Sequence, residues 1–194
     1  MSQCVVDYAH ETQEYPGKAN FLLGAQLYPS GNCPRGFLRS MINPSADNNR
    51  SSSCWHPKFD RMFNETHGGN DMWCYVDVHW SSGVANRAFY LAAKGLNQTC
   101  DQAVKPAAIG LTSACNIFYR ALTSYLSKVA DYHELRTATV QAAKDLFGAS
   151  SPEASSLAQA WDIVGAPRAP YPNTNAPKCQ PGFATAASCI RGLV

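Results

Sequence analysis

The sequence lacks the short motifs that mark most self-contained catalytic sites. It contains no HExxH zinc-binding pair, no GxSxG nucleophile turn, no P-loop and no GxGxxG dinucleotide motif. Charged residues make up only 15% of the 194 residues, and the net charge is +2 without a basic stripe. Nucleic acid is therefore not an expected partner. No run of about 18 apolar residues occurs, so no membrane span is expected either.

The eight cysteines include no CxxC pair, which argues against a zinc ribbon or a thioredoxin-like site. An even number spread along a chain is typical of disulfides formed in an oxidising compartment. Buried free thiols are the alternative. Short loops favour three pairings: Cys33–Cys54, Cys100–Cys115 and Cys179–Cys189.

Three glycosylation triplets, which begin at Asn49, Asn64 and Asn97, also indicate a secreted, extracellular protein. The first ten residues, however, carry neither the basic nor the apolar region of a secretion signal. We therefore expect either a mature or partial product of an exported protein, or a protein that is not exported.

Hydrophobic periodicity predicts a mainly α-helical fold, a helical bundle around a shared core. The expected helices span about 2–14, 81–94, 109–126, 132–147 and 151–164. Ser81 or Ser82 is expected to cap the second helix, and Ser151 with Pro152 to begin the last. Leu122 and Leu146 fall on apolar stripes and are expected to face the core.

Two segments lack helical periodicity. Residues 43–76 are rich in Asn, Ser, Asp and Gly, and predict a long irregular loop that Cys54 and Cys74 would cross-link through disulfides. Residues 167–194 are rich in proline, contain Cys179 and Cys189, and predict an irregular tail.

Asp77 and His79 form the first candidate site. A carboxylate that accepts from one imidazole nitrogen orients the ring and favours its protonated form. The other nitrogen can then donate to a developing oxyanion. An ordinary surface or cap pair is the alternative. Arg39, among apolar neighbours, could bind a carbonyl group with its guanidinium, or could form a structural ion pair.

None of the histidines has a partner at the spacing of a metal-binding pair. The nearest approach is His10-Glu11, in which Glu14 stands where a second histidine is needed. His56, His67 and His133 also lack such a partner, so no metal ligand is expected in this chain.

Several segments, taken in order, resemble the C-terminal half of thermolysin-like zinc metalloendopeptidases. They are GKANFLLG, LRSM, DVHWSSGVANRAFYLAA, IFYRALTSYLS, LRTATVQAAKDLFGASS and QAWDIVG. The resemblance covers about residues 1–166 and implies the α-helical domain that forms one wall of a peptidase cleft. Asp77 two residues before His79 is more similar to the pseudolysin and vibriolysin branch.

The resemblance implies roles for six residues in hydrolysis of a peptide or protein substrate. His79 matches the histidine that stabilises the oxyanion, and Asp77 matches the carboxylate that orients it. Arg39 matches the arginine that holds the substrate carbonyl beyond the scissile bond. The pocket for the residue after that bond would be lined by Leu23, Leu27 and Leu38. A large apolar substrate side chain is the implied preference.

The same resemblance implies that the metal chemistry lies outside this chain. MSQCVVDYA resembles the segment just after the third zinc ligand, so all three zinc ligands and the general base would belong to a missing N-terminal catalytic half. Alone, the chain would be inactive. Asp7 and Asn20 fall near calcium-ligand positions, but Cys4 replaces an acidic residue, so a calcium site is not predicted.

Three functions remain open at this point: the C-terminal half of a secreted zinc endopeptidase, a non-catalytic module that binds peptides or a protease without zinc ligands, and a purely structural scaffold. The first predicts an exposed apolar patch that a covering partner would bury. This patch would contain Leu23, Leu27, Leu38 and Val84. Polar residues in their place would favour the second.

Overall fold

The computed structural model describes residues 20–25, 36–47, 51–56, 59, 63–67, 70–74, 78–95 and 106–170, and for 63–67 and 70–74 the backbone alone. The predicted helix over 2–14, the Cys179–Cys189 pair and residues 171–194 of the predicted tail lie outside these residues.

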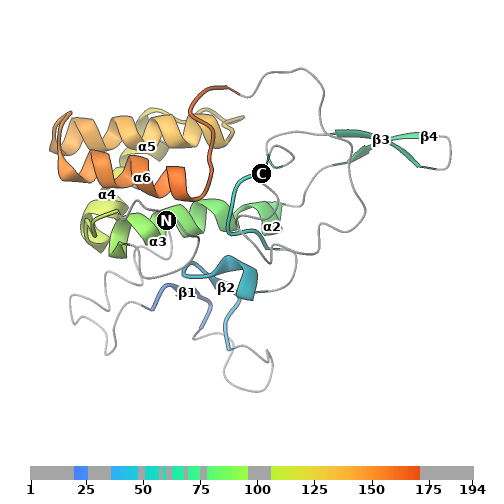
Figure 1. The fold of residues 1–194 in the computed structure, drawn as a ribbon, viewed down its shortest axis with the longest axis horizontal. Coiled ribbons are helices and arrows are strands. Elements are labelled where there is room, and N and C mark those ends of the chain that lie inside the picture. The colour runs from blue at the N-terminus through green and yellow to red at the C-terminus, as the bar shows by residue number, and fades with distance from the viewer. Residues whose placement is uncertain are drawn as a thin grey trace.

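The described part of the chain is mainly α-helical, as predicted. Its long helices are α3 (Gly83–Lys94), α4 (Leu111–Ser124), α5 (Tyr132–Phe147) and α6 (Pro152–Ile163). In Figure 1, α5 and α6 lie side by side next to α3, and the short strands β1 and β2 lie on the other side of α3. None of these helices is long and apolar enough to cross a membrane.

The two best-defined helix starts are capped by side chains. The Asp131 carboxylate accepts the backbone N–H of Glu134 at 2.8 Å at the start of α5. The Ser151 hydroxyl accepts the N–H of Ala154 at 3.2 Å, and Pro152 occupies the first turn of α6. Such caps satisfy N–H groups that the helix itself leaves without partners. The predicted cap at Ser151 is therefore confirmed.

The predicted cap of α3 is wrong. Ser82 precedes this helix with helical backbone angles, and its side chain makes no cap hydrogen bond. A short helix, α2 (Val78–Ser81), comes directly before it. The Ser82 N–H donates to the Val78 carbonyl at 3.0 Å, so helical bonding continues across the junction.

The main core surrounds Trp161 of α6, which is fully buried. Its ring stacks on Phe118 with centroids 6.3 Å apart and meets the ring of Tyr132 at 6.5 Å. Its indole N–H donates to the Thr139 hydroxyl at 2.8 Å, which satisfies the one polar group that such a burial would otherwise leave unpaired. Trp161 therefore joins α4, α5 and α6. Two residues that the apolar stripes assigned to the core, Leu122 and Leu146, are exposed instead.

A second core cluster attaches the N-terminal segment to α3 and α4. Phe21 is buried at a φ of 54° and packs edge-on against Tyr90 with centroids 5.2 Å apart. Phe21 and Met41 flank the paired strands β1 (Leu22–Leu23) and β2 (Arg39–Ser40). Burying these two side chains against α3 fixes the strands beside the helix.

The loop predicted over 43–76 is not irregular throughout. It begins with a 3₁₀ turn, η1 (Pro44–Ala46), and contains an antiparallel hairpin of β3 (Phe63–His67) and β4 (Asn70–Cys74). The hairpin extends away from the helices (Figure 1). The predicted Cys33–Cys54 disulfide is wrong, because Cys54 is present as a thiol. Cross-linking through Cys74 stays a prediction. Cys115 is disulfide-bonded.

An ion-pair network holds the chain after α6 against α5. The Asp162 carboxylate accepts from Arg136 at 2.5 Å and from Arg168 at 2.6 Å. Arg136 also donates to the Ala166 carbonyl at 2.7 Å. Burial alone would raise the pKa of Asp162, but the hydrogen bonds and positive charges of both arginines outweigh burial and lower that pKa.

Candidate functional site

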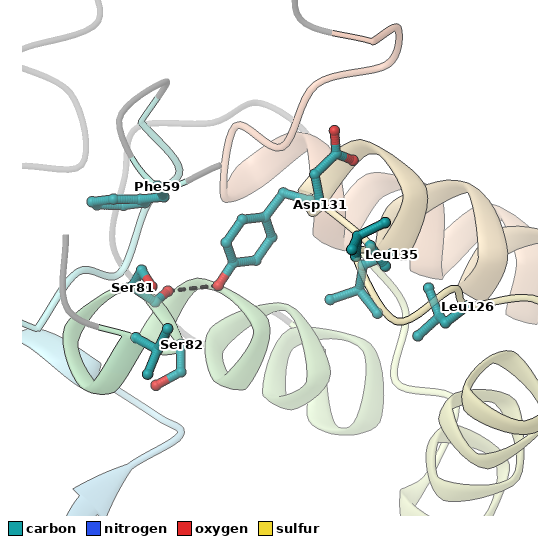
Figure 2. A pocket seen from close by; sticks show the side chains of 10 residues that line it. Phe59, Ser81, Ser82, Leu126, Asp131 and Leu135 are labelled. Atoms are coloured by element: carbon teal, nitrogen blue, oxygen red, sulfur yellow. Dashed lines mark hydrogen bonds between the residues drawn. The ribbon is translucent and has the colours of Figure 1, made fainter. Parts of the chain in front are cut away.

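The helix α2 carries His79 and is fixed at its carbonyl end by two hydrogen bonds from elsewhere in the chain. The Tyr132 hydroxyl donates to the Ser81 carbonyl at 2.6 Å (Figure 2), and the Ser52 N–H donates to the Trp80 carbonyl at 3.1 Å. The last carbonyls of a helix need such partners because no further turn supplies them. His79 itself is exposed, while the backbone of its helix is fixed.

Arg39 comes to the same region from β2. The strand pair aligns Leu23 with Arg39, and the guanidinium carbon of Arg39 lies 5.6 Å from the centre of the Trp80 ring. Trp80 directly follows His79, so Arg39 lies against the short helix that carries His79. Asp77, also a predicted site residue, lies outside the described residues.

Asp47 completes this arrangement and was not singled out from the sequence. Its carboxylate is buried, accepts the Ser40 N–H at 2.5 Å, and lies 4.0 Å from Arg39 Nε. The turn η1 positions it, because the Asp47 N–H closes that turn on the Pro44 carbonyl at 3.0 Å. Asp47 is therefore the partner for the structural ion pair that is the alternative role of Arg39 expected from the sequence.

The predicted apolar patch is only partly present. Leu38 is 47% exposed and Leu23 is half-buried against the second core cluster, whereas Leu27 lies outside the described residues. Val84 was also expected on this patch, but it is fully buried in the main core. The reason is helical geometry: Val84 lies on the face of α3 that packs on α6.

A pocket of about 370 Å³ lies next to α2. Its floor and walls are mainly apolar, with Phe59 and Leu135 among them, and Ser81 contributes from the helix that carries His79 (Figure 2). Val78, at the start of the same helix, also lines the pocket. Because successive helical residues are about 100° apart, Trp80 projects from the side of α2 opposite to Val78. The pocket and the Arg39 stack therefore flank this short helix.

Within the described part of the chain, no group of three or more His, Cys, Asp or Glu side chains could hold a metal ion. His133 directs Nδ1 toward the Pro167 carbonyl at 3.4 Å and serves the packing of the segment after α6. These residues do not fit a zinc centre. What the arrangement offers is hydrogen-bond donors, an imidazole and a guanidinium, next to apolar surface.

The family model described as "Thermolysin metallopeptidase, alpha-helical domain" matches residues 1–166. Over 88 residues the chain is 42% identical to a thermolysin from Alicyclobacillus acidocaldarius subsp. acidocaldarius, covering 45% of this chain and 16% of that relative. It is 33% identical over 143 residues to neutral protease B from Bacillus subtilis (strain 168), covering 74% and 24%.

A further relative is the transglutaminase-activating metalloprotease of Streptomyces mobaraensis, which is 29% identical over 180 residues, covering 87% of this chain and 21% of that relative. The chain thus spans no more than a quarter of these three curated relatives. The matched residues end at residue 166, whose carbonyl accepts from Arg136 in the network around Asp162.

Proposed function

Because the chain belongs to the thermolysin metallopeptidase family, as its α-helical domain, we propose that it forms one wall of a peptide-hydrolysing cleft. In this role His79 donates to the oxyanion and Arg39 holds a substrate carbonyl. The observation that carries the proposal is the meeting of Arg39 with Trp80, directly beside the exposed His79.

The proposed work of His79 is electrostatic. As a peptide carbonyl becomes tetrahedral, its oxygen gains negative charge, and a positioned N–H donor stabilises that charge more than it stabilises the substrate. The fixed backbone of α2 supports this role because a donor that is already in place needs no reorganisation during the reaction. Asp77 is proposed to orient the ring and favour its protonated form.

The proposed work of Arg39 is to bind a substrate carbonyl on the far side of the scissile bond. A guanidinium offers several N–H donors in one plane, so it can hold a backbone oxygen in a defined direction. Leu23, Leu27 and Leu38 are proposed to line the neighbouring pocket. The exposed Leu38 side chain supports a preference for a large apolar substrate residue, which would cover it.

Zinc and the general base are proposed to come from polypeptide outside this chain. The described residues do not form a metal site, and the chain matches only a small part of its relatives. When bound, zinc would supply Lewis-acid chemistry at the peptide carbonyl and its attacking water. Calcium is assigned no ligands here. Secretion and membership of the pseudolysin and vibriolysin branch stay predictions.

A chimera tests this function. In the Streptomyces mobaraensis relative, the segment that matches this chain is replaced by this chain, and cleavage of a peptide with Leu after the scissile bond is measured. We expect activity that a chelator abolishes and that requires His79 and Arg39. A folded chimera that binds zinc yet has no activity, or whose activity is indifferent to both residues, would contradict the proposal.

A further inference from the structure

We propose that Asp47 and Trp80 are positioning residues that hold the Arg39 guanidinium in one orientation for substrate binding. The inference rests on the proposed function, because it adds two residues to the carbonyl-binding site assigned to Arg39. Neither residue is assigned to bind substrate itself. Both act through Arg39, one at the edge of its guanidinium and one at its face.

Asp47 fixes the Nε edge. Its buried carboxylate lies 4.0 Å from Arg39 Nε, and the opposite oxygen is held by the Ser40 N–H at 2.5 Å. The Arg39 side chain is 16% exposed and that of Asp47 is fully buried, so water screens this pair only weakly. An arginine beside a carboxylate that cannot move is restricted in the rotation of its terminal group.

Trp80 fixes the plane. The Arg39 guanidinium carbon lies 5.6 Å from the centre of the Trp80 ring, a distance at which the ring face attracts the cation. The backbone that carries this ring is held, because the Ser52 N–H donates to the Trp80 carbonyl at 3.1 Å. Trp80 therefore gives Arg39 a surface that belongs to the same helix as His79.

The remaining donors of Arg39 identify which atom serves the substrate. Nη1 donates to the Leu38 carbonyl at 2.9 Å, which fixes the second corner of the guanidinium. With Nε toward Asp47 and Nη1 toward Leu38, Nη2 makes no hydrogen bond to any residue that the structure describes. We assign Nη2 as the nitrogen that binds the substrate carbonyl.

A pre-positioned arginine is expected to change affinity rather than the chemical step. The substrate carbonyl beyond the scissile bond keeps its charge through the reaction, so Arg39 binds substrate and transition state alike. Loss of its orientation then raises KM and leaves kcat unchanged. Ordering one long side chain corresponds to about a five- to tenfold change in affinity.

The first experiment observes Arg39 directly in the whole chain. Proton exchange of the arginine Nε–H groups is measured by ¹⁵N NMR, with the exposed Arg120 as the internal reference. We expect Asp47→Asn, which keeps the acceptor for Ser40 but removes the charge, to speed exchange at Arg39 about tenfold and leave Arg120 unchanged. Trp80→Leu should also speed it, and Trp80→Phe, which keeps an aromatic face, should restore it.

If circular dichroism shows that Asp47→Asn is unfolded, the comparison of Trp80→Leu with Trp80→Phe tests the positioning role by itself. Unchanged exchange at Arg39 in the folded variants overturns the positioning role. In the chimera, Asp47→Asn and Trp80→Leu should raise KM about five- to tenfold with kcat within twofold. If Arg39→Ala raises KM but Asp47→Asn and Trp80→Leu do not, the positioning role is overturned and the proposed function stands. If Arg39→Ala also leaves KM unchanged, the proposed function is overturned as well.

Discussion

At the scale of single residues, the site combines an exposed donor with a constrained one. His79 faces solvent on a short helix, and Arg39 is held among Trp80, Asp47 and the Leu38 carbonyl. These environments suit the two proposed tasks. An oxyanion donor must be reachable by the reacting carbonyl, whereas a carbonyl-holding group gains from being ordered before substrate arrives.

Replacing His79 should affect the chemical step. In the active chimera, His79→Ala is expected to lower kcat by about 10²- to 10³-fold, because it removes one oxyanion donor, and to change KM little. Steady-state kinetics on the peptide with Leu after the scissile bond measure both values. His133→Ala is the matched control, since that imidazole faces the Pro167 carbonyl. A rate within twofold of wild type would make His79 an ordinary surface histidine.

At the scale of elements, one contact sets how closely the loop before α2 can approach α3. A Cβ atom built on Gly83 would lie 2.2 Å from the Ser52 carbonyl oxygen and 2.8 Å from Pro44 Cβ. No side chain fits there. The turn η1, and with it Asp47, therefore lies directly on the first turn of α3.

Gly83→Ala should destabilise the protein even though alanine favours helices. Ser52 cannot move without straining the hydrogen bond that its N–H donates to the Trp80 carbonyl, so the added methyl forces the loop away. We expect the free energy of unfolding to fall by about 2–3 kcal/mol. Urea denaturation measures this, with Asn116→Ala at an exposed position of α4 as control. A stabilised Gly83→Ala protein would contradict the contact.

The Asp162 network makes a prediction about pH. Since its pKa is lowered in the folded protein, the stability it contributes is present above the unfolded pKa and is lost as pH falls through the folded pKa. Asp162→Asn should therefore cost about 1–2 kcal/mol at neutral pH, a range reduced for partial exposure, and clearly less at about pH 2. Urea denaturation at both pH values measures this. An equal cost at both would exclude the charge as its cause.

The helices could be predicted from sequence because each carries its own signals. Ser151 with Pro152 begins α6, Gly95 and Gly148 follow α3 and α5, and the apolar spacing between these signals is helical. The hairpin was missed because the polar composition of 43–76 concealed it, although Gly68-Gly69 between two five-residue runs is a hairpin signal.

The site was only partly predictable for a different reason. His79 and Arg39 were identified by resemblance, but Asp47 and Trp80 act through contacts between a strand, a 3₁₀ turn and a helix. No periodicity in the sequence encodes such a contact. Val84 was wrongly assigned to the exposed patch, because helical spacing shows which residues share a face but not which element packs against that face.

At the scale of the whole molecule, the chain combines a folded helical core with the two donors proposed to act in the cleft. The core around Trp161 unites α4, α5 and α6, while the second cluster attaches the strands that carry Arg39. The described surface beside the site keeps Leu38, Ile42 and Val78 exposed. Apolar side chains in this position are consistent with a further domain that covers them.

The chain alone should neither bind zinc tightly nor hydrolyse peptides. The described residues contain no metal-binding group of side chains, so that part of the chain offers nothing that would hold an ion to activate a water. Equilibrium dialysis with zinc, followed by metal analysis, should find well under one equivalent retained. Cleavage of the Leu-containing peptide should not exceed the uncatalysed rate. Chelator-sensitive turnover by the purified chain would contradict the assignment of zinc to another polypeptide.

The bond from the Tyr132 hydroxyl to the Ser81 carbonyl has a consequence for genetic screens. Tyr132 stands at the start of α5 and is buried, yet it supports the helix that presents His79. A library scored only for lost proteolysis would return Tyr132→Phe alongside true active-site variants. Melting temperature would not distinguish Tyr132→Phe from active-site variants. Turnover measured at lower temperature would, because α2 frays less there and only Tyr132→Phe should regain activity.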